Sequence, residues 1–325
     1  MPLPEKRNLW QDSGVARRTH SGLFPGLARL EPELFISRSD LRYASRPQDL
    51  EPYNHLEPLR GGGATYAAML EAIRGAHSFV HLETYILRSD SVGRRFAAAL
   101  VDRAQHGVAV RVIFDSVGSM GIESAFLDEL EKGGVKLVEY HPIRPWRRHF
   151  RVARRDHRKL LIVDNRVAFA GGHNIGLEYA PIAEGGLGWH DVHLRCEGPV
   201  VVAAERLFRA TWIGQGGAIY PVQRELLAMW ARPAETALAQ LVHNRRLRQR
   251  FRFRRAYLQA IRRATKSISI MNAYFVPDRG IRVALKQAAK RGVRVRLILP
   301  GVSDLRVVKF ASQRMYTSLL RAGVH

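Results

Sequence analysis

Two side chains suited to phosphoryl chemistry, His157 and Lys159, lie two residues apart, and Asp164 follows five residues later. On an extended segment, residues two apart share a face, so we expect the imidazole and the ammonium to point the same way and Arg158 to point away. An imidazole can attack phosphorus or transfer a proton, and a neighbouring ammonium neutralises phosphate charge. The pattern therefore predicts a phosphoryl-transfer site.

A β-hairpin is expected to position these residues. Residues 160–163 are an apolar run of strand length, 165–166 are a turn signal, and 167–170 have the composition of a returning strand. Asp164 falls at the turn, where we expect it to hold the turn and the nearby backbone rather than to perform chemistry.

Further candidate residues follow the hairpin. Gly171 and Gly172 allow the backbone to come close to a bound group, and Asn174 adds a hydrogen-bond donor. The alternative is a purely structural hairpin. Chance explains the motif poorly once the glycines and the asparagine are included.

The spacing His157-x-Lys159-x4-Asp164, followed by Gly-Gly-x-Asn, resembles the motif of the phospholipase D superfamily. The longer run 157–179 is similar to the first such motif of bacterial cardiolipin synthases. The resemblance implies a two-step transfer in which His157 attacks a phosphodiester and forms a phosphatidyl-histidine. A second histidine protonates the leaving alcohol, while Lys159 and Asn174 bind the non-bridging oxygens. It implies neither a metal nor another cofactor.

One acidic residue is expected to act through His157. In the superfamily, an acidic residue about this far past the first motif hydrogen-bonds the catalytic histidine. The run 189–200 also resembles cardiolipin synthases, and it contains Asp191. Asp191 is therefore expected to orient His157, and an ion pair with an arginine is the alternative.

Helical and strand patterns alternate around the motif. Helices are expected at 65–75, 92–106, 123–132, 200–214 and 222–230, and further strands at 78–87, 108–114, 135–140 and 191–196. This alternation predicts an α/β fold, with a mixed sheet flanked by helices.

The sequence repeats itself after 185 to 189 residues. The segment H-L-E-T-Y-I around Tyr85 matches I-M-N-A-Y-F around Tyr274, which indicates a duplicated α/β unit. Glu83 and Asn272 occupy equivalent places beside these tyrosines. We expect all four side chains to line a pocket, with plain strand packing as the alternative.

The repeat defines the predicted domains. They are a basic arm (1–53), a first phospholipase D-like unit (54–235), a basic linker (236–255) and a second, incomplete unit (256–325). A second copy of the motif would fall near residue 346, after the last residue given. The two motifs of the family form one site, so we expect the sequence to be truncated and weakly active by itself.

Composition indicates the kind of partner. The chain has 52 Lys and Arg against 29 Asp and Glu, a net charge of +23, which favours an anionic partner. Charge alone does not separate lipid from nucleic acid, but the resemblance favours an anionic phospholipid, phosphatidylglycerol, at a membrane surface. The single cysteine, Cys196, excludes an intramolecular disulfide and a cysteine-built metal site.

A second feature also points to the membrane. The loop 141–155 contains six arginines with Trp146, and Trp146, Arg147 and Arg148 are expected to meet lipid at the mouth of the site. An ordinary solvated loop is the alternative. No apolar stretch reaches the length of a membrane span, so the expected location is cytoplasmic, peripheral to the bacterial inner membrane.

Three functions remain open at this point. The first is a phosphatidyltransferase that makes cardiolipin from phosphatidylglycerol. The second is a hydrolase of the same superfamily, either a phospholipase D or a nuclease. The third is an inactive protein that binds anionic lipid or nucleic acid.

Overall fold

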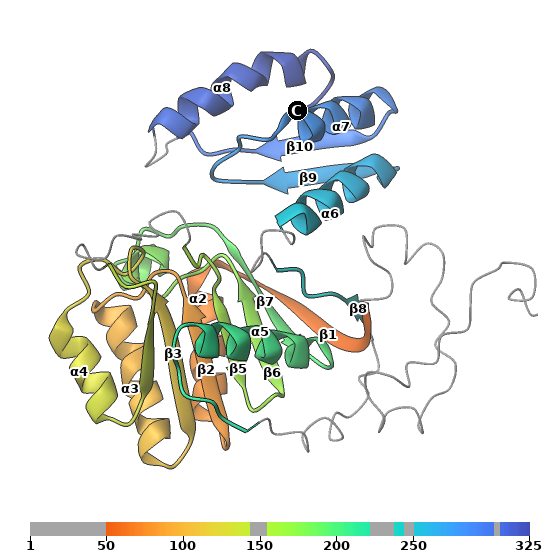
Figure 1. The fold of residues 1–325 in the computed structure, drawn as a ribbon. Helices are drawn as coiled ribbons and strands as arrows, with labels where there is room; N and C mark the ends of the chain where they lie inside the picture. The colour runs from red at the N-terminus through yellow and green to blue at the C-terminus, as the bar shows by residue number, and fades with distance from the viewer. Residues whose placement is uncertain (1–49, 144–154, 222–236, 244–249, 302–305) are drawn as a thin grey trace, which may run out of the picture. The chain divides into compact units, whose positions relative to one another are not determined.

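The computed structural model describes residues 50–143, 155–221, 237–243, 250–301 and 306–325. Helices and strands alternate along the first part as the sequence predicts (Figure 1). Their bounds are β1 Glu51–Arg60, α2 Gly61–Arg74, β2 Phe79–Thr84, α3 Ser91–Gln105, β3 Ala109–Asp115, α4 Ser124–Lys132, β4 Lys136–Tyr140, β5 Leu160–Val163, β6 Val167–Gly171, η2 Leu177–Tyr179, η3 Ile182–Glu184, β7 Val192–Glu197, α5 Val200–Gly214 and β8 Ala237–Ala239.

These strands form one eight-stranded mixed sheet in the order β4-β3-β2-β5-β6-β7-β1-β8. Strands β2, β3 and β4 are parallel, and the pairs from β2/β5 to β1/β8 are antiparallel. Helices α2, α3 and α4 pack on one face and α5 on the other. The predicted fold class, a mixed sheet flanked by helices, is confirmed.

Strand β5, which lies within the motif between Lys159 and Asp164, is at the centre of this sheet. Leu161 and Val163 of β5 pack on the face covered by α2 and α3, whereas Leu160 and Ile162 pack on the α5 face. All four are at most 4% exposed, and burying each is worth about 1.5–3 kcal/mol. Burial on both faces explains why β5 is continuously apolar. It also fixes the start of β5, next to His157 and Lys159.

The boundaries of the first unit differ from the predicted ones. Strand β1 begins at Glu51, inside the predicted arm, and pairs with β7 over residues 55–60. Strand β8 lies inside the predicted linker and pairs with β1. These pairings join residues 132 to 188 positions apart in the sequence, from Arg60–Val192 to Glu51–Ala239, and a local pattern does not show them.

The second unit has its own elements and core. They are α6 Arg250–Arg263, β9 Ser267–Met271, α7 Arg279–Lys290, β10 Arg294–Ile298 and α8 Arg306–Leu320. Strands β9 and β10 are parallel, and Val324 bridges to Val295 in the same direction. The core includes Leu258, Leu285, Val295 and Leu319. Helix α6 begins inside the predicted linker, which is a further difference from the expected boundary.

The order α6-β9-α7-β10-α8 repeats α2-β2-α3-β3-α4. The second helix of each set begins at a capping aspartate. Asp90 accepts from the Gly93 amide at 2.9 Å, and Asp278 accepts from the amides of Gly280 and Ile281 at 2.6 and 3.1 Å. The predicted internal repeat is confirmed, and the two copies share this capping aspartate.

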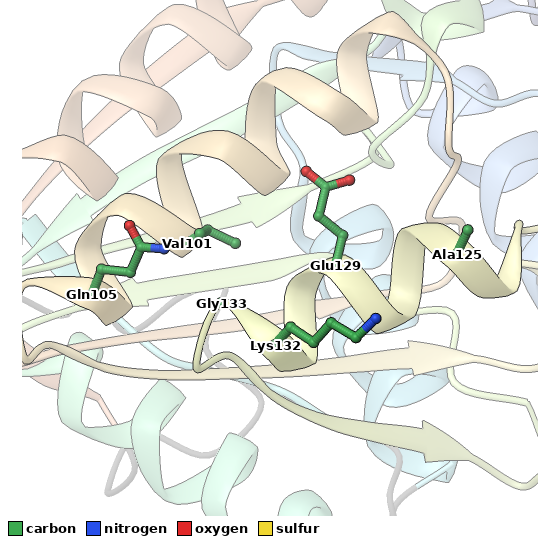
Figure 2. Close-up of a pocket in the computed structure, with 6 residues that line it drawn as sticks. All are labelled: Val101, Gln105, Ala125, Glu129, Lys132 and Gly133. Carbon is green, nitrogen blue, oxygen red and sulfur yellow. The ribbon is translucent and has the colours of Figure 1, made fainter.

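A shallow hollow of about 420 Å³ lies between α3 and α4 (Figure 2). It is lined by Val101, Gln105, Ala125, Glu129, Lys132 and Gly133. A Cβ on Gly133 would approach the Val101 side chain to 2.6 Å, so the two helices are in close contact at its end. The hollow contains no residue of the motif. Within the described ranges, no helix has both the length and the apolarity that crossing a membrane requires.

Candidate active site

His157 and Lys159 lie side by side in the extended segment that leads into β5. Lys159 Nζ is 3.1 Å from His157 Nδ1 and donates to the His157 carbonyl oxygen at 2.8 Å. Residues 155–159 precede strand β5. Their side chains still alternate as predicted, because Lys159 contacts His157 whereas Arg158 bonds to Asp156. The imidazole is exposed, whereas Lys159 is only 6% exposed. This arrangement presents an accessible imidazole next to a held ammonium.

Tyr85 adjoins the pair from the end of β2. Its ring centroid lies 4.5 Å from that of His157, and Lys159 Nζ lies 5.2 Å from the centre of the same ring. The antiparallel pairing of β2 with β5 brings Tyr85 to this position. The structure thus places Tyr85 beside the motif, and its contact with a substrate stays a prediction.

The surroundings set the charges of the two groups. Partial desolvation lowers the pKa of His157, the Lys159 charge lowers it further, and Asp156 and Asp115 oppose these effects. Burial lowers the pKa of Lys159 to about 8, against the charges of Asp156, Asp191 and Asp115. Near neutral pH, the imidazole is therefore neutral and the ammonium largely charged, as a nucleophile and an anion-binding group require.

The residues on either side of His157 are held by buried charges. Arg158 donates to both oxygens of Asp156, Nε at 2.7 Å and Nη2 at 2.8 Å, and Nη2 also pairs with Glu83 at 2.9 Å. Asp156 is 4% exposed and Glu83 is 1% exposed. Burial raises the pKa of Asp156, but its hydrogen bond with Glu83 and the charge of Arg158 outweigh burial and bring that pKa below its ordinary value.

A second anchor comes from Asp115 at the end of β3. Its carboxylate is fully buried and accepts from the Asp156 amide at 2.9 Å, and Arg155 Nη1 lies 3.7 Å away. The network Glu83–Arg158–Asp156–Asp115 thus fixes the backbone on which His157 is carried. Sequence reasoning missed Asp115 and Asp156. The available signal for Asp115 was a charged residue ending the apolar strand V-I-F, and β2 separates that strand from β5.

This network changes the prediction for Glu83, whereas the role of Asp164 rests on separate hydrogen bonds. Glu83 was expected to line a pocket, but its burial and its ion pair with Arg158 place it inside the sheet. Asp164 accepts hydrogen bonds from the amides of His77, Ser78 and Phe79 at 2.8, 2.9 and 2.8 Å. Asp164 therefore ties the hairpin turn to the start of β2, which is the structural role the sequence predicts for it.

Asn174 and Gly172 make structural contacts that the motif did not predict. The Asn174 amide donates to the Tyr179 hydroxyl at 2.5 Å, and its oxygen accepts from the Ile86 amide at 3.0 Å. A phosphate would therefore have to use the second amide hydrogen. A Cβ on Gly172 would collide with the Asp191 carboxylate, so the close approach that this glycine permits is to Asp191.

Asp191 precedes β7, on the Gly172 side of the site. Its carboxylate accepts from the Val192 amide at 2.7 Å, and its charge raises the pKa values of Lys159 and His173. The carboxylates whose charges act on His157 are Asp156 and Asp115. Orientation of His157 by Asp191 therefore stays a prediction.

The other predicted site residues lie in the second unit or outside the described residues. Asn272 follows β9, and its side-chain oxygen accepts from the Tyr274 amide at 2.8 Å. Tyr274 is 44% exposed. Pocket-lining roles for these two stay predictions. Trp146, Arg147 and Arg148 lie outside the described residues. Across the described part of the chain, no three His, Cys, Asp or Glu side chains gather as a metal site would require.

Comparison with known proteins shows the family. The sequence model described as "Cardiolipin synthase, PLD-like domain" matches residues 69–179 and 257–325, which fall in the two repeats. The chain belongs to this family. The match confirms the resemblance to cardiolipin synthases within the phospholipase D superfamily.

Relatives in this cardiolipin synthase family cover most of the chain. It is 34% identical to cardiolipin synthase A of Pseudomonas fluorescens (strain SBW25) over 275 residues, which is 83% of this chain and 56% of that protein. It is 33% identical to the cardiolipin synthase of Geobacillus thermodenitrificans over 329 residues, 98% of this chain and 66% of that protein. The chain thus spans a little over half to two thirds of the length of these relatives.

A solved structure shares the fold. It is the phosphatidylserine synthase of Haemophilus influenzae, with a TM-score of 0.55 and 14% identity over 82% of this chain and 68% of that one. At this identity the likeness concerns the fold alone.

Proposed function

We propose that this chain carries active-site residues of a phosphatidyltransferase that makes cardiolipin from phosphatidylglycerol. The observation that supports this most strongly is the His157–Lys159 pair, 3.1 Å apart, in a chain whose curated relatives are named cardiolipin synthases. A neutral, accessible imidazole beside a charged ammonium has the properties that attack on an anionic phosphodiester requires.

In the first step, a ring nitrogen of His157 attacks the phosphorus of phosphatidylglycerol. A P–N bond forms, the P–O bond to the glycerol headgroup breaks, and glycerol leaves with a proton from a second histidine. Lys159 turns its ammonium from His157 to a non-bridging oxygen as negative charge develops there. The buried network around Asp156 and Arg158 keeps the His157 backbone in place during this change.

In the second step, a primary hydroxyl of another phosphatidylglycerol gives its proton to the second histidine and attacks the phosphorus of the phosphatidyl-histidine. The P–N bond breaks, cardiolipin forms and His157 returns to its free state. Two phosphatidylglycerol molecules thus give one cardiolipin and one glycerol. Water in place of the second lipid would give phosphatidic acid, the product of a hydrolase. Because both substrates are lipids, we place the reaction at a bilayer surface, with the protein bound peripherally.

Product analysis tests this proposal. The protein is incubated with vesicles of labelled phosphatidylglycerol, and the lipids are separated. Cardiolipin with an equimolar amount of glycerol supports the transferase, whereas phosphatidic acid with no cardiolipin contradicts it. The variant His157→Ala should abolish product formation. His106→Ala, at an exposed histidine after α3, should leave it unchanged.

A further inference from the structure

The connection between β6 and β7 exposes three large apolar side chains. Ile182 is 77% exposed, Leu187 63% and Trp189 46%. Single exposed apolar residues are ordinary on protein surfaces and need no explanation. Three of this size within eight residues form a cluster, which we call the apolar rim.

The three side chains of the apolar rim are neighbours in space. A Cβ placed on Gly188 would lie 2.9 Å from the Ile182 side chain, so Ile182 lies against the segment that carries Leu187 and Trp189. The Trp189 ring packs edge-on against Tyr179, with 5.1 Å between centroids. The three rim residues are therefore carried on one compact loop.

The loop that carries the rim is well ordered by its own hydrogen bonds. The Gly186 amide donates to the Pro181 carbonyl and the Gly188 amide to the Ala180 carbonyl, both at 3.0 Å. At Gly62, a Cβ would collide with the Tyr179 carbonyl, so the base of the loop lies directly on α2. The fold thus holds these apolar side chains in solvent, and a partner that covers them has little ordering entropy to overcome.

The rim adjoins the candidate active site. Asp191, two residues after Trp189, packs against Gly172, and its charge acts on Lys159. Tyr179, against which Trp189 packs, bonds to Asn174. A surface that contacts the rim therefore also lies next to the motif.

We infer that the apolar rim inserts into the interfacial region of an anionic phospholipid bilayer and brings the mouth of the site to its lipid substrate. Tryptophan favours the boundary between headgroups and acyl chains, and Ile and Leu bury in the acyl region beyond it. The net charge of +23 complements an anionic leaflet. Exposed Arg60, opposite Val192 in the β1–β7 pairing, adds a cation beside the rim. This inference rests on the lipid substrate of the proposed function.

Vesicle binding tests the inference directly with the whole chain. We compare its partition onto vesicles containing phosphatidylglycerol with that of the variant Ile182→Ser/Leu187→Ser/Trp189→Ser. The matched control is Ile219→Ser/Phe310→Ser/Leu320→Ser, at residues that are 77%, 64% and 62% exposed. The rim variant should lose at least tenfold in partition and the control less than twofold, with the thermal midpoints of all three proteins unchanged.

Fluorescence locates the contact. Lipids with brominated acyl chains should quench the bound protein, and Trp189→Phe should reduce that quenching while vesicle binding is kept. The inference is overturned if the native chain does not bind these vesicles or if the rim variant binds as the native chain does. It is also overturned if the rim variant dissociates a dimer of the native chain in sedimentation, because the rim would then be a subunit contact.

The two proposals can fail separately. Rim-dependent vesicle binding with phosphatidic acid and no cardiolipin as the product would contradict the proposed function and support the rim. Cardiolipin formation with vesicle binding that does not depend on the rim would do the reverse.

Discussion

The ammonium of Lys159 lies 3.1 Å from Nδ1 of His157, and 2.8 Å from the carbonyl oxygen of the same residue. Two cations at this distance repel each other, so the pair favours a neutral imidazole whenever the lysine is charged. The contact between the two residues therefore keeps the proposed nucleophile in its reactive form.

Replacing Lys159 by Met should separate these effects. Without the neighbouring charge, the pKa of His157 should rise, although burial will still hold it below its ordinary value. Turnover should fall about 10²- to 10³-fold because the developing phosphate charge loses its partner. Titration of the His157 ring signals by NMR measures the first effect. An unchanged or lower pKa would show that the Lys159 charge does not act on the imidazole.

The same pair predicts the pH dependence of the reaction. Activity needs a neutral His157, so it should be lost as pH falls through the lowered pKa of that residue. It also needs a charged Lys159, so it should fall again above about pH 8, where the lysine loses its proton. A profile of kcat/KM against pH measures both limbs. A profile still rising at pH 10 would contradict this account.

Arg158 should matter more for stability than its partial exposure suggests. In Arg158→Met, Glu83 and Asp156 remain buried without their cation, which should cost about 3–5 kcal/mol of unfolding free energy. Adding Glu83→Gln should recover part of this loss, since one buried carboxylate is then neutral. Urea unfolding of the single and double variants gives the coupling energy. Additive losses would mean that Arg158 and Glu83 do not interact.

His193 should make the fold sensitive to acid. Burial, with smaller effects of His173 and Lys159, lowers its pKa to about 3, from an ordinary 6.5. Between these values the unfolded chain binds a proton that the folded chain does not, so this contribution to stability is complete above pH 6.5 and is lost as pH falls toward 3. Unfolding free energies measured from pH 7 to 4 should fall less steeply in His193→Phe. Equal slopes in the two proteins would contradict the effect.

The parts of the fold that depend on neighbours in sequence could be predicted. The hairpin of β5 and β6 was visible because an apolar run, a turn signal and a second run follow directly on one another. The repeat was visible because each copy retains its helices, strands and glycines. Asp164 was assigned to the turn for the same local reason, and its three amide partners lie at the start of β2.

The parts that depend on distant segments could not. Strand β1 contains Pro52 and Pro58, which argue against a strand inside a sheet. Pro58 is tolerated because, within the described residues, β1 pairs with β8 only at Glu51 and Asn54, away from this proline. Likewise, Glu83, Asp115 and Asp156 come from three segments, and their grouping around Arg158 follows only from the strand order β3-β2-β5.

The central claim is that His157 becomes covalently attached to the phosphatidyl group. Rapid quenching of the protein with phosphatidylglycerol labelled at phosphorus in alkaline detergent, followed by peptide mapping at alkaline pH, measures this directly. We predict an acid-labile label on the peptide that contains His157, absent in His157→Ala and retained in His106→Ala. Label that persists in His157→Ala, or cardiolipin formed by that variant at the native rate, would contradict the account.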